Sequence, residues 1–143
     1  MQVSRRAARV FAMQVLYGIE ITGCTPGEAI PAVLASETFT PTMQAYGMNL
    51  VDLVLEHREA FSATLQSLSE GWDLDRMAQL DRILIMIGFA ELTHVTDVPV
   101  KVVLQEAVQI ANKYSTEQSG IFVNGILDRF ARDSKMLGDS YND

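Results

Sequence analysis

Three stretches between residues 77 and 132 repeat apolar residues at steps of three and four. Such steps line one face of a helix, whereas a half-buried strand alternates at every second residue. The stretches hold Leu80, Ile83, Leu84 and Ile87; then Val100, Val103, Leu104, Ala107, Val108 and Ala111; and then Val123, Ile126, Leu127 and Phe130. Because each helix has one apolar stripe to bury, the three are predicted to pack as a bundle.

The N-terminal half adds helices with local start signals. Residues 4–22 carry another helical stripe of apolar residues. Thr25 and Thr40 are each followed by a proline, which places a capping hydroxyl before a residue suited to the first helical turn. These signals predict a short helix that ends near Ser36 and a longer one that ends near Glu56.

The remaining segments are also predicted to be helical. A helical period continues after His57 to Gly71, and Asp73 or Asp75 is placed to cap the helix that follows. No stretch shows a strand pattern that competes with these helices. The sequence therefore predicts an all-α protein of six or seven helices.

The chain is predicted to form a single helical domain over residues 1–133, followed by a frayed acidic tail over residues 134–143. The tail lacks a helical period, as chain ends often do. Within the domain, Ser115 and Gln118 have the spacing of a capping box at the start of the last helix.

The composition is that of a folded protein. Of its 143 residues, 48% are hydrophobic, which is enough to build a core, and 20% are charged. No apolar run is long enough to span a membrane, and no apolar signal core follows the N-terminus. We therefore expect a cytoplasmic protein.

The reactive side chains do not form a recognisable catalytic or metal-binding set. Cys24 is the single cysteine, so neither an internal disulfide nor a cysteine-based metal cluster can form. His57 and His94 are far apart in sequence and lack partners at metal-ligand spacing. We expect a protein that is not an enzyme and that uses no cofactor and no metal.

Positive charge is concentrated at the start of the chain. The net charge is −7, which by itself disfavours a nucleic-acid partner. Yet Arg5, Arg6 and Arg9 precede every acidic residue, and their spacing spreads three guanidinium groups over one helix end. Guanidinium groups pair with phosphate oxygens and stack on bases. The residues alone fit either an RNA-binding surface or an ordinary solvated helix face.

A second candidate lies at the start of the last helix. Phe122 is placed toward the edge of the buried stripe, and Asn124 adds an amide nearby. A partly exposed aromatic ring beside an amide is a suitable platform for an unstacked base. A phenylalanine at the edge of the core fits the same spacing. Gly125, beside Asn124, indicates a close approach by another helix.

These residues also carry a resemblance to a known family. Four motifs carry it: Arg5-Arg6-x-Ala8-Arg9, Gln14-Val15-Leu16-Tyr17, Asp97-Val98-Pro99-x-Lys101 and Phe122-Val123-Asn124-Gly125-Ile126-Leu127-Asp128. Together they resemble the two ends of the NusB family. The resemblance implies a fold of two antiparallel three-helix sub-bundles. It also implies a transcription antitermination factor that binds boxA RNA with the ribosomal protein NusE and joins RNA polymerase, notably on ribosomal RNA operons.

The resemblance also implies roles for individual residues. The positions that it associates with RNA binding, matched motif by motif, are Arg5, Arg6, Arg9, Tyr17, Asp81, Phe122 and Asn124. Ala7 stands where some relatives have a further arginine, and Gln118 where the residue is often acidic. These departures indicate weaker RNA binding by the chain alone and more dependence on the protein partner.

An alternative stays open at this point. The acidic body and apolar helices also fit a protein-interaction or dimerisation module with no RNA role of its own. A homodimer formed through the arginine face would cover the RNA surface.

Overall fold

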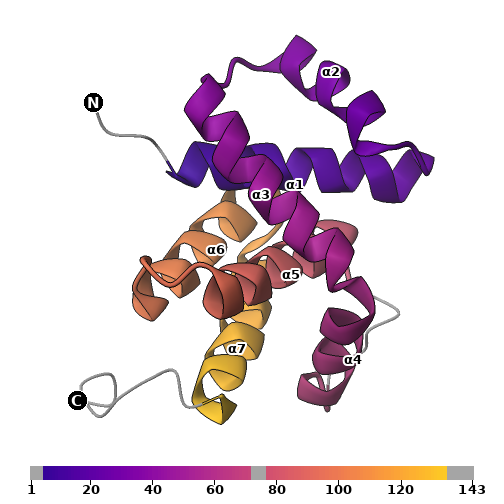
Figure 1. Ribbon diagram of the computed structural model, residues 1–143. Helices are drawn as coiled ribbons and strands as arrows, with labels where there is room; N and C mark the ends of the chain where they lie inside the picture. Colours follow the sequence, from indigo (N-terminus) through magenta and orange to yellow (C-terminus); the bar gives the residue numbers. More distant parts are fainter. Residues whose placement is uncertain (1–4, 72–76, 135–143) are drawn as a thin grey trace.

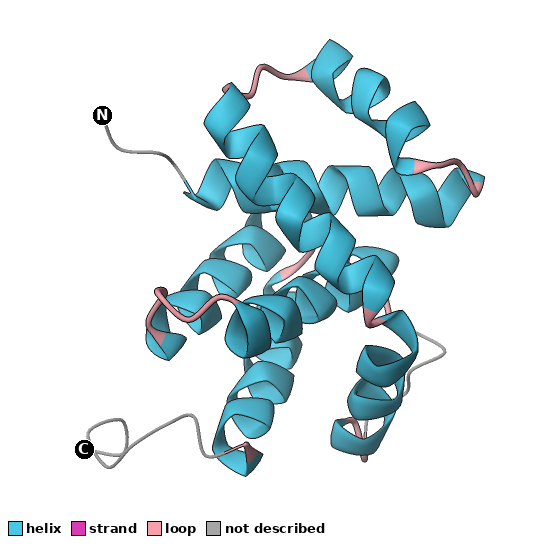
Figure 2. Ribbon diagram, viewed as in Figure 1, coloured by secondary structure: helices cyan, strands magenta, loops and turns pink. Residues whose placement is uncertain are grey.

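The protein is all-helical, as the sequence predicts. The computed structural model describes residues 5–71 and 77–134, which form seven helices and no strand (Figures 1 and 2). The helices are α1 (Arg5–Thr22), α2 (Pro26–Ser36), α3 (Pro41–Glu56), α4 (Arg58–Leu68), α5 (Gln79–His94), α6 (Val100–Tyr114) and α7 (Glu117–Asp133). Across these described ranges, no helix is long and apolar enough to cross a membrane.

Local side-chain signals set several helix boundaries. Thr25 accepts a hydrogen bond from the Glu28 backbone amide and forms a complete capping box. Thr40 caps α3 through the Met43 amide, also as predicted. Gly23 ends α1 with a φ of +71°, a conformation that glycine adopts without strain.

The capping box at α7 lies one residue later than predicted. Thr116 and Ser119 form it, because Thr116 has the extended backbone of an N-cap while Ser115 still closes α6. The predicted caps Asp73 and Asp75 lie outside the described residues, as does the predicted tail after Ser134.

The helices form two groups joined through α5. In Figure 1, α2 runs back along α1 and α3 crosses α1, whereas α5, α6 and α7 pack together below them. Helix α4 packs on α5 and α7. Both α1 and α3 contact α5, so one core runs through both groups.

Helix α5 is more deeply buried than its predicted stripe. Every residue from Ile83 to Glu91 is buried, because neighbouring helices cover α5 on several sides. Phe89 lies at the centre of this core, with its ring centroid 4.5 Å from that of Phe130 and 5.7 Å from that of Phe61. The prediction of one buried face is therefore wrong for this helix.

Two glycines permit close helix contacts. A Cβ at Gly47 would lie 2.8 Å from the carbonyl oxygen of Ala8, so α3 can approach α1 only with glycine there. A Cβ at Gly88 would lie 2.6 Å from a methyl group of Leu127. A Cβ at Gly125, by contrast, would have no neighbouring atom within 4 Å, so the predicted close approach of another helix at that residue is wrong.

Candidate nucleic-acid interface

The first turn of α1 carries two exposed arginines, each held by a carboxylate from the other end of the chain. Arg5 donates to Asp97 at 2.8 Å, and its guanidinium also lies 5.0 Å from the ring centre of Tyr46. Arg6 donates two hydrogen bonds to Glu106, at 2.9 and 2.5 Å. The Arg5 and Arg6 side chains remain 39% and 51% exposed. Two guanidinium groups are therefore positioned at the surface.

These contacts also affect the carboxylates. The hydrogen bonds from Arg6 lower the pKa of Glu106 below its usual value, and the bond from Arg5 does the same to the pKa of Asp97. Both acids are thus held in their charged form as acceptors. An incoming phosphate group would have to compete with them for the arginines.

The third arginine is buried. Arg9 donates to Glu91 at 2.5 and 2.8 Å, and these side chains are only 4% and 1% exposed. The Tyr46 hydroxyl donates to the same carboxylate at 2.9 Å. Burial, followed by the charge of Glu91, raises the pKa of Tyr46 to about 12. Arg9 therefore fits neither the RNA-binding surface nor the solvated helix face expected from the sequence, because α1 is covered by α3, α5 and α6.

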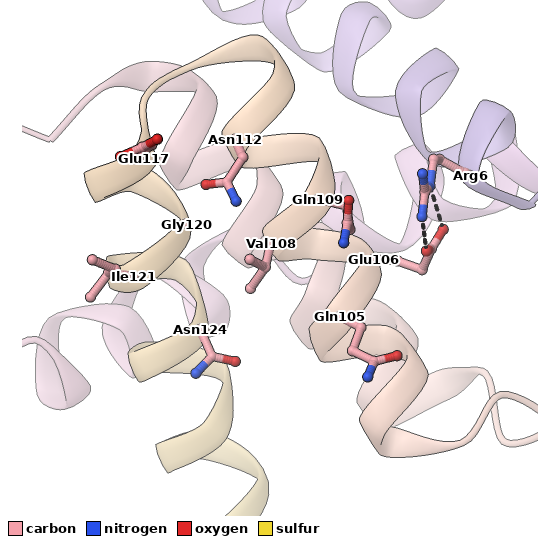
Figure 3. A pocket seen from close by; sticks show the side chains of 10 residues that line it. All are labelled: Arg6, Gln105, Glu106, Val108, Gln109, Asn112, Glu117, Gly120, Ile121 and Asn124. Atoms are coloured by element: carbon pink, nitrogen blue, oxygen red, sulfur yellow. Dashed lines mark hydrogen bonds and ion pairs between the residues drawn. The ribbon is translucent and has the colours of Figure 1, made fainter.

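A polar groove lies beside Arg6, between α6 and α7. It encloses about 580 Å³ and is shown in Figure 3. Its lining residues are Arg6, Gln105, Glu106, Val108, Gln109, Asn112, Glu117, Gly120, Ile121 and Asn124. Side-chain amides provide both hydrogen-bond donors and acceptors, which is what base edges require. The groove therefore combines a guanidinium group, which is able to pair with phosphate, with amides that are able to contact base edges.

The structure brings two of the predicted site residues together here. Arg6 and Asn124 line the same groove, although they are far apart in sequence. Sequence reasoning missed Gln105, Gln109 and Asn112, which follow one another at steps of four and three along α6. That spacing was a usable signal, since it places three amides on one exposed helix face.

Two other predicted residues are buried near this groove. Phe122 is only 7% exposed and belongs to the core, so the expectation of a partly exposed ring is wrong. Asp81, also 7% exposed, accepts a hydrogen bond of 3.0 Å from Ser119 in the capping box of α7. Asp81 thereby connects the first turn of α5 to the first turn of α7.

Tyr17 lies in a different place. It is 40% exposed and lines a groove between α1 and α2 that shares no residue with the groove beside Arg6. Tyr17 lies eleven positions after Arg6, which corresponds to about 16 Å along the helix axis. The structure therefore does not join Tyr17 to the arginine surface.

The fold and the groove define a small helical protein with an arginine-bordered polar groove near the start of its first helix. A sequence model described as the NusB family matches residues 6–132. The chain belongs to the NusB family.

Relatives and solved structures agree with this assignment. The chain is 36% identical to the transcription antitermination protein NusB of Desulfitobacterium hafniense, covering 99% of this chain and 97% of that protein. It is 39% identical to the NusB protein of Anaeromyxobacter dehalogenans, with 89% of each covered. Its fold is similar to NusB in a crystal structure of the antitermination factors NusB and NusE with double-stranded RNA. That match has a TM-score of 0.80 and 28% identity, and covers 90% of this chain and 96% of the other.

A second solved structure, NusB of T. maritima, matches with a TM-score of 0.81 and 28% identity. The match covers 92% of this chain and 93% of that chain. Similarity therefore extends over almost the whole length in both sequence and fold.

Proposed function

We propose that this chain is a transcription antitermination factor that binds boxA-type single-stranded RNA together with NusE. In this proposal the complex joins the RNA polymerase elongation complex and suppresses termination, notably on ribosomal RNA operons. Family membership supports the antitermination role. The solved complex of a relative with NusE and RNA supports the two binding partners.

The observation that carries the RNA-binding proposal is the position of Arg6. Its guanidinium is half exposed and borders a groove lined by four amide side chains. Arg6 would bind a backbone phosphate, with Arg5 contributing a second positive charge at the same helix end. Asn124 and the amides of α6 would contact the bases along the groove.

The buried members of the predicted set would act indirectly. Arg9 would hold α1 in place through Glu91, and Asp81 would fix the start of α7 through Ser119. Phe122 would contribute by packing α7 on the core. In this proposal they position the groove rather than contact RNA. Tyr17 would affect RNA binding only through a surface separate from the groove.

The negative net charge of the chain makes its RNA binding dependent on the protein partner. A net charge of −7 repels RNA over most of the surface, and both exposed arginines already have carboxylate partners. We therefore expect weak RNA binding by the chain alone and stronger binding when NusE adds further contacts. A titration with boxA-type RNA, with and without NusE, tests this expectation.

The decisive experiment compares Arg6→Ala with a matched control. Arg132→Ala removes an exposed arginine from α7 that pairs with Asp128, one turn away on the same helix. Arg6→Ala should weaken binding of boxA-type and unrelated RNA alike, and lower the slope of log affinity against log salt by about 0.7. Equal RNA affinity for the two variants would contradict the site. Fluorescence anisotropy at several salt concentrations gives both quantities.

A second candidate function rests on the same ion pairs. Because Arg5 and Arg6 are already paired within the chain, a protein-interaction or dimerisation module needs no RNA to explain them. Light scattering with and without RNA separates the two. A homodimer that RNA does not dissociate would favour this second function.

A further inference from the structure

Helix α2 leaves apolar surface exposed on the outside of the fold. Glu28 is its only charged residue, and only Ala29 and Val33 are buried, although most of its residues are apolar. Leu34 is 37% exposed. In a surface helix the outer face is normally polar. An apolar outer face of this kind is typical of a surface that a partner covers.

Helix α1 continues this apolar surface. Tyr17 and Ile21, one turn apart, are 40% and 56% exposed. Between the two helices lies a groove of about 430 Å³, with Tyr17 on the α1 side and Ala32 on the α2 side. Gly18 and Ala29 also line the groove, one from each helix. The groove has the size and lining to accept a large apolar side chain.

The charge that lines the groove is negative, because Glu28 is the one charged residue among those that line it. No lysine or arginine occurs between Val10 and His57, whereas this stretch contains Glu20, Glu28, Glu37, Asp52 and Glu56. In the described fold the main packing partner of α2 is α1, and none of the residues that line the groove between them is a lysine or an arginine. Arg58, the next cation along the chain, is paired with Glu20. The field at this surface is therefore negative, which repels RNA and attracts a basic protein.

We propose that the groove between α1 and α2 docks a positively charged, amphipathic segment of a partner protein. An apolar side chain of that segment would enter the groove beside Tyr17, and a flanking lysine or arginine would face Glu28. This is the helix-in-groove mode of recognition. The inference does not rest on the proposed RNA function, because the two grooves have no lining residue in common.

The test uses two model peptides with leucines at helical spacing, one with lysines and one with glutamates at the polar positions. Backbone amide NMR shifts of the full chain report where each peptide binds. The lysine peptide should shift the amides around Tyr17 and Ala32, and the glutamate peptide should leave them unchanged. Shifts centred elsewhere, or equal shifts with both peptides, would overturn the proposal.

Two variants with opposite charges at the same position identify the sign of the charge on the bound segment. Ala32→Arg and Ala32→Glu both fill the groove from an exposed helix position, so both should weaken binding of the lysine peptide. Ala32→Arg should weaken it more, by roughly a further fivefold, because like charges meet. Ala63→Arg and Ala63→Glu, at an exposed position on α4, give the control for net charge. Their affinities should stay close to that of the wild type.

RNA is the alternative ligand for this groove. The same variants test whether RNA binds there. If RNA occupied this groove, Ala32→Arg would raise RNA affinity and Ala32→Glu would lower it, relative to the Ala63 pair. That result would overturn the proposal. Unchanged RNA affinity in both Ala32 variants supports it. Thermal melting by circular dichroism checks that all four variants fold.

Discussion

The start of α1 contains the same side chain in two very different settings. Arg6 is half exposed and shares its guanidinium between Glu106 and an open groove. Arg9, less than one turn further, is buried and joined to Glu91. Both are arginines paired with glutamates from the C-terminal half of the chain, and both have two short hydrogen bonds.

Burial decides what each pair can do. An exposed ion pair contributes little to stability, so Arg6 can exchange its carboxylate for a phosphate at small cost. A buried ion pair cannot lose one partner without leaving an unpaired charge in the core. The comparison therefore separates an arginine whose guanidinium is available to a ligand from one that holds the core together.

The largest expected effect is on the structural arginine. Arg9→Ala should lower the free energy of unfolding by about 3–5 kcal/mol, because Glu91 is left buried without its cation. Arg6→Ala should lower it by about 1 kcal/mol or less. Urea unfolding followed by circular dichroism measures both. Similar losses for the two variants would remove the distinction between them.

A double replacement tests whether the loss of stability comes from the unpaired buried charge. Arg9→Met combined with Glu91→Leu removes both buried charges and keeps apolar volume. The double variant should be more stable than Arg9→Met alone, because no unpaired charge remains in the core. A double variant that is less stable than this single one would show that the pair itself contributes net stability.

The next effect concerns Tyr46, the second donor to Glu91. Tyr46→Phe should lower stability near neutral pH by about 1.5–3 kcal/mol, the range for a hydrogen bond to a charged group. The folded state raises the pKa of Tyr46 from 10 to about 12. Its contribution is therefore complete below pH 10 and is lost as the pH rises toward 12.

The difference in stability between the wild type and Tyr46→Phe should accordingly shrink across this alkaline range. Denaturant unfolding at a series of pH values measures it. A difference that stays constant from pH 10 to 12 would show that the hydroxyl of Tyr46 is not held in its neutral form.

The smallest effect tests the exposed pair. Glu106→Gln should raise RNA affinity by about fivefold or less, because freeing Arg6 regains only the 0.2–1 kcal/mol of an exposed pair. Glu117→Gln is the control, since it removes the same charge from the same groove without releasing an arginine. If both variants gain equally, the gain comes from net charge and not from Arg6.

The parts of the fold that depend on neighbouring residues were predictable. Thr25 and Thr40 cap the helices that their sequence context predicts, since the donor lies three residues away. The overall all-α class also follows from the periodic stripes. A one-residue error at Ser115 arose because two adjacent hydroxyls can each serve as the cap.

The parts that depend on distant residues were not predictable from the residues themselves. Burial of Arg9 requires Glu91, which is 82 positions away, and burial of Phe122 depends on how α7 meets the core. A single helical stripe gives no information on how many neighbours cover a helix. For the same reason the groove between α6 and α7 was missed, although Asn124 was chosen on its motif.

The long span of the Arg9–Glu91 pair has a consequence for the order of events during protein synthesis. The first helix leaves the ribosome well before Glu91, and Glu106 follows later still. Until these glutamates have been synthesised, the arginines of α1 have no carboxylate from α5 or α6 with which to pair. Domains fold largely as units once their sequence has emerged. The arginine surface therefore takes its final form only when nearly the whole chain has been made, so a truncated product cannot assemble it.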